Sequence, residues 1–292
     1  MRNRFSERLY EEAIKDPRIY VVVSDISPAG SMQNFRKDFP DRFINVGVAE
    51  QAMIGICAGL AREGAIPFAY SIGAFSLIRP YEMIRDDIAI PGLGVKIVGV
   101  GGGLAYSLLG PTHHTPEDIG LTAILPNFTT YAPADRDEVD LMFDQMLSNQ
   151  EIKNPTYIRL GKAGEPLLSN NSIRDQLNFR FLARNKNSKT LILGYGLIME
   201  RAMKIQKILE SKNGKKCDVM SLFKVNPINY QQLSKLFLEY ENLIIIEEHY
   251  EIASLASEII LKKSKFYNHL NIINFNMNHK FYKFYGNHDE IL

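Results

Sequence analysis

One carboxylate, Glu50, lies within an otherwise uncharged stretch from Asn45 to Leu60. A single acidic residue that begins a helix is most often a cap that interacts favourably with the helix dipole. A catalytic interpretation is also possible, because an apolar site penalises the charged carboxylate, raises its pKa and suits it to share a proton with a ligand. Spacing alone leaves both interpretations open.

Two adjacent histidines, His113 and His114, belong to the segment Gly-Pro-Thr-His-His-Thr-Pro-Glu-Asp at 110–118, behind a glycine-rich stretch. Neighbouring side chains point in different directions, and the sequence identifies no third ligand, so we expect no metal site in this chain. A histidine that only forms hydrogen bonds and a catalytic histidine are both compatible with this segment.

Other candidate residues follow short apolar runs that are typical of buried parallel strands. Ligands of open parallel sheets gather at the carboxyl ends of the strands. Arg159 ends one run and could bind a phosphate or pair with a carboxylate. The aromatic and aliphatic residues that follow another run are spaced by three, which is typical of core packing: Phe75, Ile78 and Tyr81. The residues after the first run are Ser24, Asp25 and Ile26.

Apolar runs alternate with segments of helical periodicity along the chain. The predicted strands span 19–23, 66–70, 95–100, 156–160, 190–193, 218–222, 243–246 and 270–275. The predicted helices span 49–62, 80–90, 135–147, 199–210, 230–240 and 252–262, and the first of these is apolar nearly all round and is expected to be buried. This alternation predicts an α/β fold of two consecutive three-layer domains with mostly parallel sheets.

The pattern breaks once, where glycine, proline, asparagine and serine dominate between Lys162 and Lys189. We place a linker at 166–188, between a first domain at 1–165 and a smaller second domain at 189–292. The tail from Asn276 is rich in aromatic, Asn, His and Lys residues and is expected to be a loose surface segment.

The overall composition excludes several classes of protein. The chain has 292 residues, of which 46% are hydrophobic and 23% charged, and a formal net charge of +1. Such values exclude a disordered chain and give no reason to expect nucleic acid or an anionic membrane as a partner. The two cysteines, Cys57 and Cys217, cannot form a disulfide framework, and no signal peptide or long apolar run is present, so we expect a cytoplasmic protein.

Three segments together resemble one enzyme family. Residues 42–51, Arg-Phe-Ile-Asn-Val-Gly-Val-Ala-Glu-Gln, resemble the signature of the pyrimidine-binding domain of transketolases and deoxyxylulose-phosphate synthases. Residues 110–114 resemble the substrate loop of that family, and 158–161, Ile-Arg-Leu-Gly, resemble its strand-end arginine. The resemblance covers the first 165 residues, and the second unit is similar in length and pattern to the family's transketolase C-terminal-like domain.

The resemblance implies a thiamine-diphosphate-binding fold, with thiamine diphosphate as cofactor, and assigns roles to the candidate residues. Glu50 would bind N1′ of the aminopyrimidine, and His113 would orient the substrate and assist proton transfer. Cofactor binding would also involve Ser24, Asp25, Ile26, Phe75, Ile78 and Tyr81. Substrate binding would involve His113, His114 and Arg159.

The chain lacks the Gly-Asp-Gly stretch with which complete transketolases hold magnesium and the diphosphate. The resemblance therefore implies the C-terminal subunit of a split transketolase. An N-terminal transketolase subunit would carry the diphosphate and Mg²⁺ site, two copies of each chain would form an α2β2 heterotetramer, and this chain alone would be inactive.

Three departures from the family pattern concern residues that usually contact the sugar. Leu109 replaces a frequent acidic residue, the stretch 99–103 lacks a histidine, and a serine is replaced near Ala29. The expected reaction is transfer of a two-carbon ketol unit between sugars or sugar phosphates, in the synthesis of an unusual sugar. The alternatives are the β subunit of a 2-oxo acid dehydrogenase and a non-catalytic regulatory partner subunit.

Overall fold

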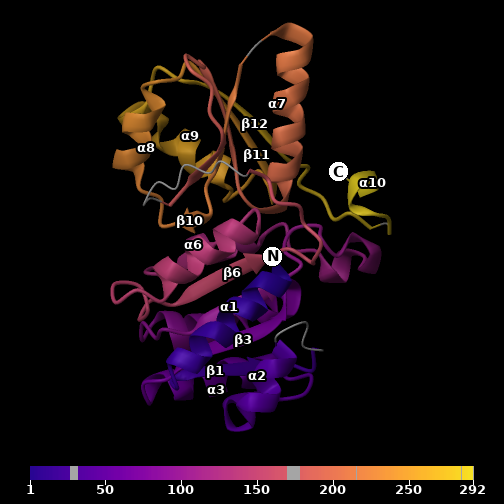
Figure 1. Cartoon of the computed structure of the whole chain (residues 1–292), viewed down its shortest axis with the longest axis vertical. Coiled ribbons are helices and arrows are strands. Elements are labelled where there is room, and N and C mark those ends of the chain that lie inside the picture. The colour runs from indigo at the N-terminus through magenta and orange to yellow at the C-terminus, as the bar shows by residue number, and fades with distance from the viewer. Residues whose placement is uncertain (27–31, 170–177, 215, 284, 292) are drawn as a thin grey trace.

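The structure is a computed structural model, and it describes residues 1–26, 32–169, 178–214, 216–283 and 285–291. These residues form two α/β units that lie one above the other along the long axis of the molecule (Figure 1). Each unit contains a mostly parallel sheet with helices on both faces. The predicted architecture of two consecutive three-layer α/β domains is confirmed.

The first sheet has seven strands in the order β10-β5-β6-β4-β3-β1-β2. Neighbouring strands are parallel except β10, which pairs antiparallel with β5. The strands span β1 Ile19–Val23, β2 Phe43–Asn45, β3 Ile66–Ile72, β4 Lys96–Val100, β5 Thr129–Tyr131, β6 Thr156–Leu160 and β10 Lys224–Asn226.

Successive residues of β1 pack on opposite faces of this sheet. Val21 and Val23 belong to the core beneath α1 and α6, whereas Val22 belongs to the core beneath α3. This alternation follows from strand geometry and explains why the whole run is apolar. The helices of this unit are α1 Arg2–Lys15, α2 Met32–Asp38, α3 Glu50–Arg62, α4 Tyr81–Met83, α5 Asp118–Ala123 and α6 Arg136–Met146.

The expectation that the helix at 49–62 is buried all round is wrong for one of its faces. Met53, Ile54 and Cys57 are buried against the sheet, but Gly55 and Gly59 are exposed on α3. A Cβ atom added at either glycine would meet no atom within 4 Å. No described part of this chain therefore covers that face of α3, although its residues are small or apolar.

The second sheet has five strands in the order β12-β11-β8-β9-β7. Neighbouring strands are parallel except β7, which pairs antiparallel with β9. The strands span β7 Arg180–Ala183, β8 Thr190–Gly194, β9 Asp218–Ser221, β11 Asn242–Tyr250 and β12 Asn271–Met277. Helix α7 Met199–Asn213 covers one face, and α8 Tyr230–Phe237 and α9 Leu255–Phe266 cover the other (Figure 1). A short helix, α10 His288–Ile291, follows.

Two expectations about irregular segments need correction. The predicted linker at 166–188 contains β7, which belongs to the second sheet, while its residues 170–177 lie outside the described residues. The tail is not loose throughout, because β12 continues to Met277 and the ring of His288 lies 2.7 Å from the Glu248 carboxylate. Polar residues dominate the sequence of both segments, and the described parts named above are held by contacts with residues distant in the sequence.

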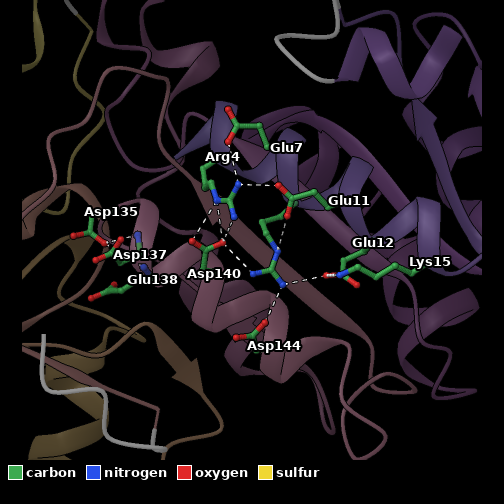
Figure 2. Close-up of polar contacts among 11 residues, drawn as sticks. Arg4, Glu7, Glu11, Glu12, Lys15, Asp135, Asp137, Glu138, Asp140 and Asp144 are labelled. Carbon is green, nitrogen blue, oxygen red and sulfur yellow. Dashed lines mark hydrogen bonds and ion pairs between the residues drawn. The ribbon is translucent and has the colours of Figure 1, made fainter. Parts of the chain in front are cut away.

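Figure 2 shows a network of ion pairs that joins α1 to α6. The Arg4 guanidinium lies 2.9 Å from Asp140, and the Arg8 guanidinium lies 3.0 Å from Asp140 and 2.9 Å from Asp144. Acidic residues of α1 itself form further ion pairs with both arginines. The network orients both guanidinium groups along the edge of the apolar core between the two helices.

A second group of charges is fully buried where the two units meet. Asp135 accepts hydrogen bonds from the backbone amides of Asp137 and Glu138 in the first turn of α6 and lies 2.6 Å from the Arg180 guanidinium of β7. Glu138, in the first turn of α6, accepts a hydrogen bond of 2.9 Å from the Ser221 hydroxyl of β9. These contacts fix the second sheet to α6.

Burial raises the pKa of Glu138 to about 8, Asp135 acts in the same direction and Arg180 opposes it. The unfolded chain releases this proton at about pH 4.3, so the native state loses stability as the pH rises between these two values. Glu138→Gln removes the titration and keeps the shape. In urea unfolding we expect the variant to be more stable than the wild type by up to about 5 kcal/mol at about pH 9, and equally stable at about pH 4.

The exposed substitution Glu251→Gln is the control and should not change this pH dependence. Lower stability of Glu138→Gln at every pH would contradict the prediction.

Candidate functional site

The candidate residues gather at the carboxyl ends of the first sheet. Ser24 follows β1, Ser71 lies near the end of β3, and Glu50 is the first residue of α3. Because β1 and β3 are parallel neighbours, their ends meet at one edge. The Ser24 hydroxyl donates a hydrogen bond of 2.8 Å to Ser71 and lies 3.4 Å from the Glu50 carboxylate.

Glu50 is buried, with 2% of its surface exposed. Its second carboxylate oxygen lies 2.7 Å from an Nη atom of Arg79, whose side chain is 42% exposed. The position of Glu50 in the first turn of α3 adds a favourable interaction with the helix dipole. The carboxylate is therefore both a helix-start residue, as the simpler interpretation has it, and a buried acid held by specific partners.

Phe75 and His113 lie side by side. Their ring centroids are 5.1 Å apart in an edge-on arrangement, and the centroid of the Tyr106 ring lies 6.5 Å from that of His113. The Arg79 guanidinium lies over the Phe75 ring, 4.4 Å from its centroid. A continuous series of contacts therefore joins Glu50 to His113 through Arg79 and Phe75.

Burial lowers the pKa of His113 below the ordinary value for an imidazole. Burial also lowers the pKa of His114, and the neighbouring His113 acts in the same direction. Both rings are consequently neutral at neutral pH. Nδ1 of His113 lies 3.0 Å from the Thr112 hydroxyl, whereas His114 is buried and its Nε2 atom has no hydrogen-bond partner among the described residues.

Arg159 is buried and makes its contacts inside the protein. Its guanidinium lies 3.1 Å from the Asp118 carboxylate and donates a hydrogen bond of 3.0 Å to the Glu248 carbonyl of the second unit. A Cβ atom at Gly103, which has a φ of +64°, would lie 2.1 Å from this guanidinium. These contacts give Arg159 a role at the junction of the two units, and its binding of a substrate phosphate stays a prediction.

The remaining predicted cofactor residues are less closely joined to Glu50. Asp25 has a φ of 50°, and its amide donates to the side chain of Asn45. Ile26 and Tyr81 are half-buried against the two apolar cores, and the Tyr81 hydroxyl donates to the Leu121 carbonyl. Ile78 is 38% exposed.

The structure describes two of the three places where the chain departs from the family pattern. Leu109 is exposed, and Ala29 lies outside the described residues. In the stretch 99–103, the Gly101 backbone is so close to the Tyr106 ring that a Cβ atom would lie 2.0 Å from it. The glycines of this stretch therefore provide room for neighbouring side chains.

The segment Glu247-Glu248-His249 lies inside β11. Glu247 accepts hydrogen bonds from the backbone amides of Leu255 and Ala256 at the start of α9, and His249 accepts one from the amide of Gly120. All of these contacts are structural.

Sequence reasoning missed Arg79, which is the residue that contacts both Glu50 and Phe75. The available signal was a single charge at the end of an uncharged run from 64 to 78, four positions after Phe75. The spacing of the neighbouring aromatic and aliphatic residues indicated core packing, and it gave no reason to expect a functional role for Arg79.

The described residues hold neither a membrane span nor a cluster of metal ligands. None of the helices in these ranges has the length and apolar character needed to cross a membrane. In the same ranges, no group of three or more His, Cys, Asp or Glu side chains could hold a metal ion.

Two protein-family models match this chain, one in each of its two units. The family model described as transketolase, pyrimidine binding domain, matches residues 1–164, and the one described as transketolase, C-terminal domain, matches residues 181–275.

Curated relatives include a subunit of the apulose-4-phosphate transketolase of Phocaeicola vulgatus, 28% identical over 89% of this chain and 82% of the relative. A 6-deoxy-6-sulfo-D-fructose transketolase subunit of a Clostridium species is 31% identical over 88% of this chain and 78% of its own.

Solved structures agree with these matches. A structure described as a split gene transketolase, inactive beta4 tetramer, aligns with a TM-score of 0.83 and 30% identity over 97% of this chain and 90% of its own. The transketolase of Campylobacter jejuni aligns with a TM-score of 0.81 over 99% of this chain and 43% of its own, and at 20% identity it supports the fold alone. The matched domains and the relatives' identity together establish that the chain belongs to the transketolase family and contains its pyrimidine-binding and C-terminal domains.

Proposed function

We propose that this chain is the C-terminal subunit of a thiamine-diphosphate-dependent transketolase and transfers a two-carbon ketol unit between sugars or sugar phosphates. The observation that supports this most directly is the buried carboxylate of Glu50, joined to Phe75 through the Arg79 guanidinium at the carboxyl ends of β1 and β3. The series of contacts from Glu50 to His113 brings an acid, an aromatic surface and a neutral imidazole into one site.

The residues present fit the aminopyrimidine ring of thiamine diphosphate. This ring needs a carboxylate partner for its nitrogen and an aromatic surface for stacking. The Arg79 guanidinium, a planar group with N–H donors, already uses both Glu50 and Phe75 in this way. The two side chains are therefore arranged for a planar, hydrogen-bonding ligand.

Each residue has a definable task in this proposal. Glu50 holds or shares a proton at the pyrimidine nitrogen, and Ser24 orients the carboxylate. His113, neutral at neutral pH, accepts or donates a hydrogen bond at the substrate oxygen next to Phe75. When bound, the cofactor supplies the nucleophilic carbon that carries the two-carbon unit.

A partner subunit completes the proposal. The sequence has no Gly-Asp-Gly stretch, and two relatives are named as transketolase subunits. We propose that an N-terminal transketolase subunit holds Mg²⁺ and the diphosphate, that an α2β2 assembly forms in the cytoplasm, and that the uncovered face of α3 contacts another subunit.

Substrate choice is proposed from the departures in the sugar-contacting segments. Leu109 offers no charge or hydrogen bond at its position, and it is exposed. The relatives' names include apulose-4-phosphate and 6-deoxy-6-sulfo-D-fructose. We expect an unusual sugar to be turned over faster than common ketose phosphates by the reconstituted complex.

Glu50→Gln tests the central assignment. Because Gln cannot hold the proton in the same way, ketol transfer by the reconstituted complex should fall about 100-fold or more, with an unchanged fold by circular dichroism. Glu63→Gln, an exposed change at the other end of α3, is the matched control and should keep full activity. Unchanged activity of Glu50→Gln would favour a non-catalytic partner subunit, and release of carbon dioxide from 2-oxo acids would favour the dehydrogenase alternative.

His113→Ala should lower kcat/KM for the sugar about 10- to 100-fold while the dissociation constant for thiamine diphosphate stays within about twofold. Because burial lowers the pKa of His113, the wild-type kcat/KM should be constant near neutral pH and should fall at acidic pH, as the ring becomes charged. An equal loss of cofactor affinity in the variant would contradict this assignment.

Gly55→Gln tests the proposed subunit contact of α3. Open space surrounds Gly55 and glutamine favours helix more than glycine does, so the isolated chain should fold at least as stably as the wild type. The larger side chain should block association with the partner in analytical ultracentrifugation. Ser211→Gln, at an exposed position of α7, is the matched control, and normal association of Gly55→Gln would exclude this face as the contact.

A further inference from the structure

We propose that Arg79 is an internal occupant of the aminopyrimidine position, which it must leave when thiamine diphosphate binds. The inference rests on the proposed function and adds a residue that limits cofactor affinity. Arg79 contacts the two side chains that the pyrimidine ring would use: Nη1 lies 2.7 Å from the Glu50 carboxylate, and Cζ lies 4.4 Å from the Phe75 ring centroid.

Local backbone geometry explains why Arg79 reaches this position. Residues Ala74–Ile78 form a π-helical turn that Arg79 ends, with the Arg79 amide donating to the Ala74 carbonyl. The wide turn brings residues four or five positions apart onto one side of the helix. Phe75 and Arg79 are four apart, so the guanidinium lies over the ring that precedes it by one turn.

The guanidinium and the pyrimidine ring use the same chemistry. A guanidinium is planar, donates N–H groups to carboxylates and stacks on aromatic faces. An aminopyrimidine is also planar and needs the same carboxylate and the same ring face. Two planar groups cannot occupy one face of Phe75 and one oxygen of Glu50 together, so binding of one requires displacement of the other.

The burial difference within the pair indicates which partner moves. The Glu50 side chain is 3% exposed and is held near Ser24, whereas the Arg79 side chain is 42% exposed. Arg79 can therefore turn toward solvent without disturbing the core. A buried carboxylate without a partner is costly, and Arg79 supplies that partner until a ligand does.

Competition of this kind predicts the direction in which the affinity for thiamine diphosphate changes when Arg79 is removed. Removal of Arg79 frees the face of Phe75 and leaves Glu50 without its cation, and both changes favour a ligand that satisfies them. The opposite interpretation, in which Arg79 contacts the cofactor after moving, predicts weaker binding when Arg79 is removed.

The test measures the dissociation constant of thiamine diphosphate with Mg²⁺, by isothermal titration calorimetry on the complex of the full chain with its partner. Arg79→Gln should tighten binding about 5- to 10-fold, the effect of losing one half-exposed ion pair and its stacking contact. Arg79→Lys keeps the charge but not the planar group and should tighten binding less, and it serves as the second variant if Arg79→Gln does not fold. Arg85→Gln, at another exposed arginine of this region, should leave the constant unchanged.

Unchanged or weaker binding by both Arg79 variants, with normal binding by the wild type, would overturn this inference alone. Absence of thiamine diphosphate binding by the wild-type complex, or an unchanged constant for Glu50→Gln, would instead overturn the proposed function.

Discussion

The burial of the Glu50 carboxylate, which must find partners inside the protein, is the constraint on which the arrangement of the site depends. A carboxylate that is 2% exposed needs partners in the folded state, and here they are a serine hydroxyl, the first turn of α3 and one guanidinium. The same guanidinium lies over Phe75, and Phe75 contacts His113. One buried charge therefore relates segments that follow β1, β3 and β4 to each other.

Buried arginines have a comparable role where the two units meet. Arg159 of β6 pairs with Asp118 and donates to the backbone of β11, while Arg180 of β7 pairs with Asp135 at the start of α6. Each arginine can make these contacts only when both units are in place. The loop that contains Gly103, which precedes His113 in the sequence, packs against Arg159 and is thereby held by the second unit.

The sequence predicts those features that depend on local pattern. The strands β1 and β6 have the predicted bounds. In β1 a continuous apolar run buried on both faces identifies a parallel strand inside the sheet. Short or polar edge strands such as β7 and β10 were missed, since distant partners define them. Glu50 and His113 were recognisable from their motifs, whereas the contacts of Arg79 and Arg159 depend on which side chains the fold brings to them.

One strand crosses between the units. Lys224–Asn226, which lies beyond β9 in the sequence, pairs with β5 and forms the outer edge of the first sheet, where the ammonium of Lys224 also meets the Glu151 carboxylate. A fragment ending before this strand would expose the hydrogen-bonding groups of β5. The first sheet would then end in an unpaired edge strand that can associate with other chains. The first sheet is thus complete only with a strand from the second half of the polypeptide. Evolution could therefore not replace either half alone without a change that covers the edge at β5.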